Sequence, residues 1–133
     1  GRGEKLLKSA TMKHLQPSIV ETLQSYLEKQ DDVLDLQVNF LKTLANRYRF
    51  RIVAALGQVE GEIEQRDLQK IVGISKANLS QHLAILRDAG VIVAGRMAGR
   101  VTYVSLRNPA IRDACALVRE MIVQRVLSAP SRR

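Results

Sequence analysis

The sequence is poor in cysteine, proline and aromatic residues, and its few aromatics include no tryptophan. A single cysteine, Cys115, excludes an intrachain disulfide. No apolar run approaches the ~20 residues needed to span a bilayer, and no signal peptide is recognisable. Internal repeats and low-complexity tracts are absent as well. These absences predict a cytoplasmic protein that makes no use of a membrane.

Side chains and motifs suited to catalysis are also scarce. The chain has two histidines and one cysteine, and it lacks a glycine-rich phosphate loop, an H-E-x-x-H motif and a G-x-S-x-G elbow. Its carboxylates Glu60, Glu62 and Glu64 fall in a stretch that we expect to be a polar loop, where we expect them to be solvated and not catalytic. The sequence therefore predicts neither an enzyme nor a bound cofactor.

Basic charge is what the sequence has in excess. The formal net charge is +8 and the isoelectric point about 10.2. From Arg96 to Arg133, eight arginines are set against only Asp113 and Glu120. This excess favours a polyanionic partner, nucleic acid first and an acidic membrane surface second, although a merely solvated surface explains charge alone equally well.

Residues 65–90 carry the pattern of two short helices joined by a tight turn. Asp67 to Val72 is a short amphipathic run, and the Gly73 after it suits the left-handed conformation that ends many helices. Ser75 is a good N-cap for a second helix, which we expect to run to Ala89. An αα-hairpin of purely structural use is the alternative interpretation.

The second helix of this pair has two unlike faces. At 100° per residue, Leu79, Leu83 and Leu86 share one side, which predicts a core face. The other side carries small and hydrogen-bonding residues, namely Ala77, Ser80, Gln81 and Ala84, with Lys76 and Asn78 toward its edges. Such a face can enter the major groove of DNA with Ser80 and Gln81 near base edges.

Residues 91–106 change from helical to strand periodicity. Two β-prone runs, 91–94 and 101–106, flank the segment GRMAGR, whose two glycines suit a hairpin tip. This predicts a β-wing with Arg96 and Arg100 placed to reach a phosphate or the minor groove. Charged hairpin tips are also ordinary on protein surfaces, so the wing indicates DNA binding only in combination with the helix pair before it.

The two ends of the chain, residues 15–45 and 108–127, are predicted to be helical. In the first, residues 30–32 are expected to interrupt the pattern, so that Asp31 or Asp32 caps a second helix. Asn108 and Pro109 suit the start of the last helix. The apolar stripes on these helices comprise Ile19, Leu23, Tyr26, Leu27, then Leu34, Val38, Leu41, Leu44, and finally Ile111, Cys115, Val118 and Ile122. Together they exceed what one small domain needs, which suggests a partner chain; covering the chain's own core is the alternative.

The chain resembles the ArsR/SmtB family of winged-helix transcriptional repressors. The resemblance covers residues 40 to about 125 and is carried by FLKTLANRYRFRIVAAL (40–56), DLQKIVGISKANLSQHLAILRDAGVI (67–92) and GRMAGRVTYVSL (95–106). Within it, the S-x-x-x-L-S-x-H-L pattern of residues 75–83 is specific. Arg49 and Arg51 match the family's T-R-L-R-I pattern and could reach phosphates, with solvated or carboxylate-paired arginines an equal alternative.

The resemblance implies a mainly α (α+β) fold, a winged helix-turn-helix with a β-hairpin wing and with N- and C-terminal helices that form a dimer interface. We expect one such domain over residues 15–127, preceded by a basic, flexible segment 1–14 and followed by a tail 128–133. Residues 1–11 are open to being non-native, with Met12 as an alternative start.

The metal sites of the family are not recognisable here. Where many relatives carry a C-x-C pair, this chain has Glu64 and Arg66, and at the zinc positions of the last helix it has Asn108, Ala110, Met121 and Gln124. Neither set suits arsenite or zinc. Of the remaining candidates His14, His82 and Cys115, we interpret His82 as a structural part of the family motif and Cys115 as a small core residue. We therefore expect no metal site.

The function implied is that of a homodimeric, sequence-specific DNA-binding repressor that binds an inverted repeat of double-stranded DNA through the major groove. The predicted DNA-binding residues are Ser75, Lys76, Ala77, Asn78, Ser80, Gln81, Arg96 and Arg100. Its signal is expected to be non-metal, and a small-molecule or redox effector stays open as a partner. The alternatives are a winged-helix module for protein contacts and a protein that compacts DNA without a chosen site.

Overall fold

The structure, a computed structural model, describes residues 14–128 and 130. The chain divides into two compact units, Gly1–Val38 and Asn39–Arg133. The boundary falls inside the stretch 15–127 that the sequence predicts to be one domain, so residues 15–38 belong to a different unit from the rest. Residues 1–13, which make up nearly all of the predicted basic segment, and most of the tail 128–133 lie outside the described residues.

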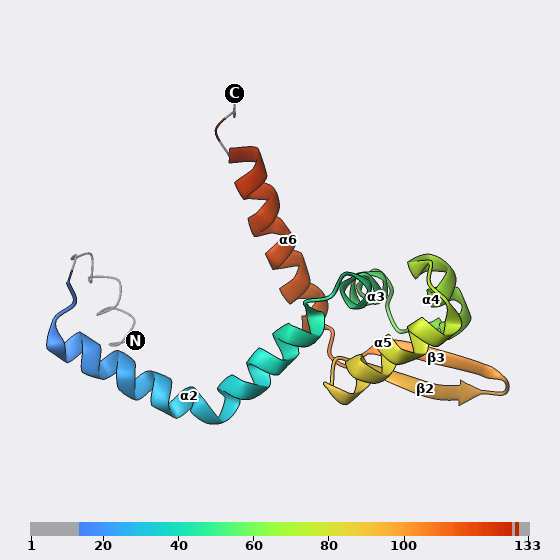
Figure 1. The fold of residues 1–133 in the computed structure, drawn as a ribbon, viewed down its shortest axis with the longest axis horizontal. Coiled ribbons are helices and arrows are strands. Elements are labelled where there is room, and N and C mark those ends of the chain that lie inside the picture. Colours follow the sequence, from blue (N-terminus) through green and yellow to red (C-terminus); the bar gives the residue numbers. More distant parts are fainter. Residues whose placement is uncertain (1–13, 129, 131–133) are drawn as a thin grey trace. The chain divides into compact units, whose positions relative to one another are not determined.

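The first helix in the described part of the chain is α2, Pro17–Leu44 (Figure 1). The predicted break at residues 30–32 is wrong, because α2 continues through them. Gln30, Asp31 and Asp32 each cost only a few tenths of a kcal/mol in a helix, whereas a real break usually needs glycine or proline. Between Ser18 and Leu44 the sequence has neither.

Three further helices follow α2, and local capping signals set their ends. Helix α3, Arg47–Gly57, begins after Asn46, whose Oδ1 accepts hydrogen bonds from the backbone N–H groups of Tyr48 (3.0 Å) and Arg49 (3.1 Å). Helix α4, Gln65–Val72, ends at Gly73, which has a φ of 76° as predicted. Helix α5 spans Lys76–Asp88. These bounds confirm the helix-turn-helix expected from residues 65–90.

A three-stranded antiparallel sheet, in the order β1-β3-β2, stands next to these helices. Strands β2 (Ile92–Ala98) and β3 (Val101–Leu106) form the expected hairpin. The strand β1, Glu62–Glu64, was not predicted, since we expected a polar loop there. It pairs with β3, with Ile63 opposite Val104. An isolated three-residue segment with two glutamates has no strand signal of its own, so β3 decides its conformation.

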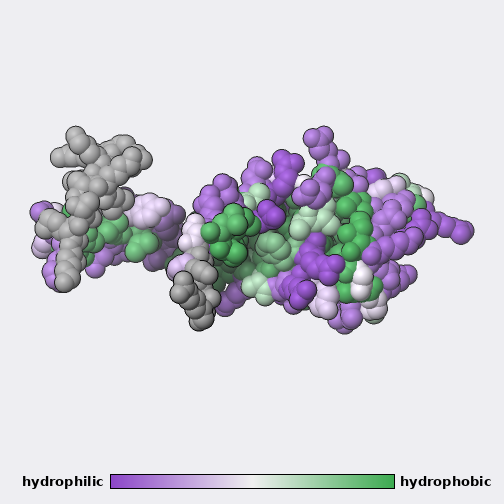
Figure 2. All heavy atoms as spheres, turned by 90° about the horizontal axis from the view of Figure 1, so that it is seen from above, coloured by the Kyte–Doolittle hydropathy of each residue, from purple (hydrophilic) through white to green (hydrophobic). Residues whose placement is uncertain are grey.

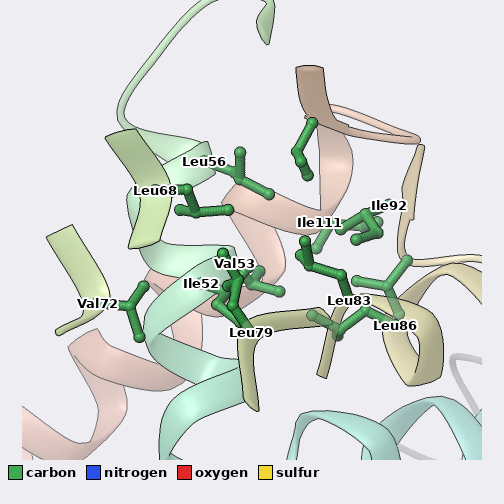
Figure 3. Close-up of a cluster of buried hydrophobic side chains, with 12 residues drawn as sticks. Ile52, Val53, Leu56, Leu68, Val72, Leu79, Leu83, Leu86, Ile92 and Ile111 are labelled. Atoms are coloured by element: carbon green, nitrogen blue, oxygen red, sulfur yellow. The ribbon is translucent and has the colours of Figure 1, made fainter. Parts of the chain in front are cut away.

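The core lies inside the Asn39–Arg133 unit, and its buried residues come from the helices α3, α4, α5 and α6 and from the hairpin region of β2 and β3 (Figure 3). Leu79, Leu83 and Leu86 from α5 are at most 4% exposed, which confirms the predicted inner face of that helix. Their main partners are Ile52, Val53 and Leu56 from α3, Leu68 and Val72 from α4, and Val91, Ile92 and Val104 from the sheet region. This packing fixes the orientation of α5, because turning the helix would expose its three leucines.

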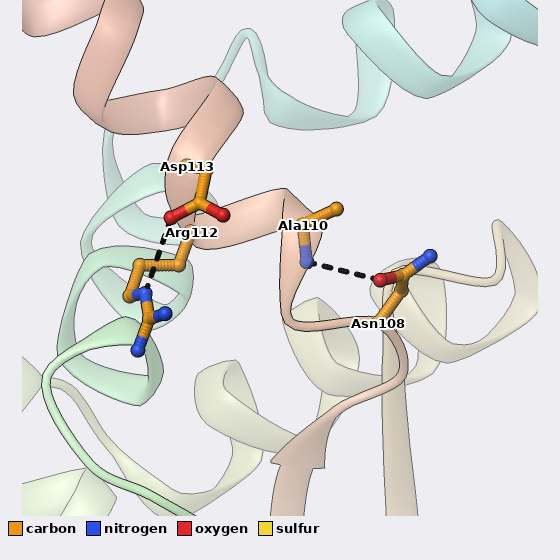
Figure 4. A network of polar contacts seen from close by, with 4 residues as sticks. All are labelled: Asn108, Ala110, Arg112 and Asp113. Atoms are coloured by element: carbon orange, nitrogen blue, oxygen red, sulfur yellow. Dashed lines mark hydrogen bonds and ion pairs between the residues drawn. The ribbon is translucent and has the colours of Figure 1, made fainter.

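The last helix, α6, spans Ala110–Ser128. As predicted, Asn108 starts it: its Oδ1 accepts a hydrogen bond of 2.9 Å from the backbone N–H of Ala110 (Figure 4). Ile111 at its beginning belongs to the core, but the later apolar residues reach the surface (Figure 2). They are Leu117, Val118, Met121, Ile122, Val123, Val126 and Leu127. None of the helices described is both long enough and apolar enough to cross a bilayer.

Gly57 is placed where α3 meets α6. It is the last residue of α3 and is buried. A Cβ at this position would stand 3.1 Å from Cγ of Arg112 in α6. Glycine is therefore needed here because α3 and α6 approach each other closely. Its φ is not positive, so backbone conformation does not require it.

Candidate nucleic-acid interface

The N-terminus of α5 is organised by Ser75. This residue has extended backbone angles, and its Oγ accepts a hydrogen bond of 3.1 Å from the backbone N–H of Asn78, as an N-cap does. The hydroxyl hydrogen of Ser75 is still free to donate to an outside acceptor. Ser75 and Lys76 are both exposed, so the first turn of α5 presents a hydroxyl, an ammonium group and the positive end of a helix dipole to solvent.

The outer face of α5 also carries the residues predicted to meet bases. Ala77, Asn78, Ser80 and Gln81 are exposed, and Ala84 is half-buried. Because α5 buries its leucines on the opposite side, these side chains form a polar surface of small residues without bulky projections. Such a surface can approach base edges closely and still offer hydrogen-bonding groups.

The back of α5 is tied to two other helices through His82 and Arg49. Nη1 of Arg49 in α3 lies 3.4 Å from Nδ1 of His82, and Nε of Arg49 donates a 2.7 Å hydrogen bond to the backbone carbonyl of Thr43 in α2. The ring of Tyr48 lies 5.8 Å from that of His82, centroid to centroid. Burial, and secondarily the positive charge of Arg49, lower the pKa of His82.

These contacts give Arg49 a role that was not among those considered from the sequence. Arg49 is half-buried and holds the end of α2 against α5, so it is neither the solvated nor the carboxylate-paired residue that we considered. Arg51 is exposed. The structural role expected of His82 agrees with its place between α3 and α5.

The hairpin tip consists of Gly99 and Arg100, between the paired residues Ala98 and Val101. Gly99 has a φ of 63°, which fits a two-residue turn with glycine in the first central position. The other glycine of GRMAGR, Gly95, has a φ of 93° and lies at an irregularity in the pairing between β2 and β3. It therefore marks a β-bulge within the strand and not the tip.

Arg96 is accordingly misplaced in the sequence-based prediction, because it lies within β2 and not at the tip. Its Nε lies 2.6 Å from Oε2 of Glu62 in β1, and its guanidinium carbon lies 4.7 Å from the ring centroid of Tyr103 in β3. The side chain thus spans all three strands. An exposed pair of this kind is a weak interaction, and it joins the base of the wing to the edge strand.

Neither Glu62 nor Tyr103 was a predicted site residue. Glu62 was missed because the strand that carries it has no local signal. Tyr103 could have been found from the strand pattern, since it lies opposite Arg96 in the β2–β3 pairing. A cation stacked on an aromatic ring across two strands is a recurrent pair.

The residues at the family's metal positions make other contacts. Glu64 and Arg66 form an ion pair of 3.3 Å at the start of α4. Asn108 caps α6, while Met121 and Gln124 are exposed along that helix. No group of three or more histidine, cysteine, aspartate or glutamate side chains is arranged to hold a metal ion within residues 14–128 and 130.

Cys115 lies half-buried in α6 beside an apolar cleft of about 330 Å³ between α3 and α6. Phe50 and Val53 line the cleft from α3, and Val118 and Ile122 line it from α6. Burial raises the pKa of the Cys115 thiol, so the reactive thiolate is disfavoured. This position agrees with the expected role of Cys115 as a small packing residue.

Comparison with known proteins gives the same picture. Residues 48–93 match the bacterial regulatory protein arsR family. The chain is 35% identical over 100 residues to Rv0081 of Mycobacterium tuberculosis strain H37Rv, an uncharacterized HTH-type transcriptional regulator, and the match covers 75% of this chain and 85% of that protein. It is also 37% identical over 65 residues to the biofilm growth-associated repressor of Xylella fastidiosa strain Temecula1, which covers 49% of this chain and 55% of the repressor.

Solved structures agree with the fold. The crystal structure of Rv0081 superposes with a TM-score of 0.62 at 36% identity, over 72% of this chain and 93% of that one. The homodimeric winged helix-turn-helix DNA-binding domain of Mb0332 from Mycobacterium bovis superposes with a TM-score of 0.67 over 92% of this chain and 100% of that one. At 20% identity, this second likeness concerns the fold alone.

Proposed function

The chain belongs to the arsR family of bacterial regulatory proteins, and from this premise we propose that it is a homodimeric repressor that binds an inverted repeat in double-stranded DNA. As a member of that family it is a transcriptional regulator and not an enzyme. We propose that it acts in the cytoplasm. Its two α5 helices enter successive major grooves, about one helical turn apart.

The observation that carries this proposal is the division of α5 into two faces. The side with three leucines is buried in the core, while the side chains of Ser80 and Gln81 on the other side are exposed and make no hydrogen bond or ion pair within the described part of the chain. This exposed face carries hydrogen-bonding groups and small residues that can reach base edges. We assign base reading to Ser80 and Gln81, with Asn78 at the edge and with Ala77 and Ala84 allowing close approach or touching a thymine methyl group.

The phosphate contacts are assigned to residues around this face. Ser75 and Lys76 hold the backbone at the start of α5, and Arg100 at the wing tip holds the flanking strand. Arg96 remains a weaker candidate, because its Nε is engaged by Glu62 while its two terminal nitrogens are free to donate.

Dimerisation is supported by the apolar residues that α2 and α6 leave exposed. In α6, Leu117, Met121 and Val126 are each more than 60% exposed, and so are Leu36 and Leu41 in α2. Monomeric soluble proteins rarely keep so many large apolar side chains in water along two helices. The fold likeness to the homodimeric domain of Mb0332 fits the same arrangement.

The releasing signal that we propose is not a metal ion, because the residues at the family's metal positions are engaged elsewhere or lack suitable ligand atoms. Any ligand that changes the relative placement of the two helix pairs would release the operator. The long α2 helix is where we place such a small-molecule effector, or a clamp between subunits. The cysteine of the sequence that a redox effector could oxidise is Cys115.

The experiment that tests the function is selection of bound fragments from the source genome, followed by titration of the recovered site. We expect a small set of fragments with a shared inverted repeat, a complex of two chains per site, and an affinity at least about a thousandfold above that for unrelated DNA. A protein that compacts DNA would bind all fragments alike. A module for protein contacts would bind none.

A further inference from the structure

A basic cleft lies between the start of α5, the start of α4 and the wing tip. It has a volume of about 410 Å³. Three cationic side chains line it, Lys76 from α5, Arg66 from α4 and Arg100 from the turn between β2 and β3. Its remaining lining residues are Glu64, Gln65, Gln69, Val101 and Thr102.

The charges of the cleft favour an anion. Three cations stand against one carboxylate, that of Glu64, which is paired with Arg66 at 3.3 Å. Within residues 14–128 and 130, neither Lys76 nor Arg100 takes part in an ion pair. The amides of Gln65 and Gln69 and the hydroxyl of Thr102 add neutral donors that suit phosphate oxygens. The three cations come from three separate elements, so their convergence is a product of the tertiary fold.

We infer that this cleft binds one backbone phosphate of DNA, through Arg66, Lys76 and Arg100 together with the polar side chains of Gln65, Gln69 and Thr102. This inference rests on the proposed function. When α5 lies in the major groove and the wing tip reaches the neighbouring minor groove, the sugar-phosphate strand that separates the two grooves must pass between them. The cleft lies between those two elements, so the strand crosses it.

Arg66 was not among the DNA-binding residues predicted from the sequence, and its ion pair with Glu64 affects how strongly it attracts a phosphate. The ion pair holds the Arg66 guanidinium near the cleft, but the carboxylate also opposes the phosphate that the cleft receives. Substitutions at the two positions should therefore act in opposite directions. Arg66 is exposed and Glu64 is half-buried, and neither belongs to the hydrophobic core, so neither change removes a core contact.

The test compares Arg66→Gln, Glu64→Gln and a control, Arg87→Gln, in the full chain. Arg87 lies at the far end of α5, is exposed and pairs with Asp88 at 3.5 Å. For Arg66→Gln we expect the slope of log affinity against log salt to shrink by about 0.9, and the affinity for specific and unrelated duplexes to fall alike, by roughly three- to tenfold. Glu64→Gln should tighten binding to both duplexes, and Arg87→Gln should match the unchanged protein. Thermal unfolding of each variant checks that the fold is kept.

A second measurement locates the phosphate. Replacing one phosphate at a time in the selected site by a neutral methylphosphonate should weaken the unchanged protein most at one position per half-site. That particular loss should be smaller in Arg66→Gln than in the unchanged protein, because only Lys76 and Arg100 then supply positive charge to the group. If the unchanged protein binds DNA but Arg66→Gln and Arg87→Gln keep the same salt slope and the same methylphosphonate profile, the cleft does not bind a phosphate. If the unchanged protein itself shows no salt-dependent binding to duplex DNA, the proposed function has failed instead.

Discussion

Nη1 of Arg49 lies 3.4 Å from Nδ1 of His82, and this contact joins α3 to the back of the proposed recognition helix. The same guanidinium donates from Nε to the carbonyl of Thr43, near the end of α2. A hydrogen bond from this guanidinium to Nδ1 requires the neutral ring, with Nδ1 as the acceptor. The position of α5 is thereby linked to the protonation of one histidine.

The first prediction is a loss of stability as the pH falls. Because burial and Arg49 lower the pKa of His82 from the ordinary histidine value of 6.5, the unfolded chain takes up a proton at a higher pH than the folded one. The free energy of unfolding should be constant well above pH 6.5, decrease as the pH drops through 6.5 toward the folded pKa, and level off below it. Urea unfolding at a series of pH values measures this.

The control for that series is His82→Asn, in which an amide oxygen can replace the acceptor but cannot titrate. His14, the other histidine, is exposed and is the same in both proteins. The difference in stability between the two proteins should itself vary with pH across this window. A difference that stays constant would mean that His82 does not carry the effect.

The second prediction concerns the other bond of Arg49. Arg49→Gln should lower the free energy of unfolding by about 1–3 kcal/mol, since it removes a charged donor from the backbone carbonyl of the buried Thr43 and breaks the contact with α5. Arg51→Gln is the matched change on the same helix at an exposed position, and should stay within about 0.5 kcal/mol. Chemical denaturation compares them, and equal effects would contradict the role given to Arg49.

The third prediction separates two serines of the same helix region. Ser75→Ala removes the N-cap of α5 and should cost about 1 kcal/mol of stability. Ser80→Ala, on the exposed face within the helix, should leave stability unchanged or raise it slightly, while reducing discrimination between operator and unrelated DNA. Thermal unfolding and DNA titration of both variants give the comparison; a stability loss in Ser80→Ala larger than in Ser75→Ala would show that the cap is misassigned.

The fourth prediction distinguishes base reading from phosphate binding. Gln81→Ala should relax preference at one base pair of each half-site, by about 1–3 kcal/mol. Arg100→Ala should weaken binding to all sequences similarly and make the salt slope shallower by about 0.9. Titration of both variants with the selected site, single-base changes of it and unrelated duplexes measures the two effects. The reverse pattern would exchange the two roles.

The fifth prediction is that zinc or arsenite at micromolar concentration leaves the protein on its operator. At the positions where many relatives carry a cysteine pair, this chain has Glu64 and Arg66, which are paired with each other, and neither supplies a thiolate ligand. An operator titration with and without the metal checks this. Metal-dependent release would show that ligands from other positions assemble a site.

The helix-turn-helix was predictable because its signals are local. Gly73 marks a left-handed helix end, Ser75 a cap, and the spacing of Leu79, Leu83 and Leu86 a buried face; each acts within one or two turns of chain. The interruption expected in α2 failed for a related reason, because three weakly unfavourable residues do not outweigh a long helical run on either side.

By itself, therefore, the sequence determined that the helix-turn-helix segment is helical, that Gly73 and Ser75 cap its two helices, and which face of α5 points outward. All of these follow from interactions between residues close together in the chain. Only the tertiary structure decided that Glu62–Glu64 is a strand, that Arg96 is held by Glu62 across the sheet, and that Arg66, Lys76 and Arg100 surround one cleft. Those relationships join residues about 10 to 43 positions apart, and no local preference encodes them. The hydrophobic core, in which the leucine face of α5 packs on α3 and the sheet, brings the elements that carry these residues together.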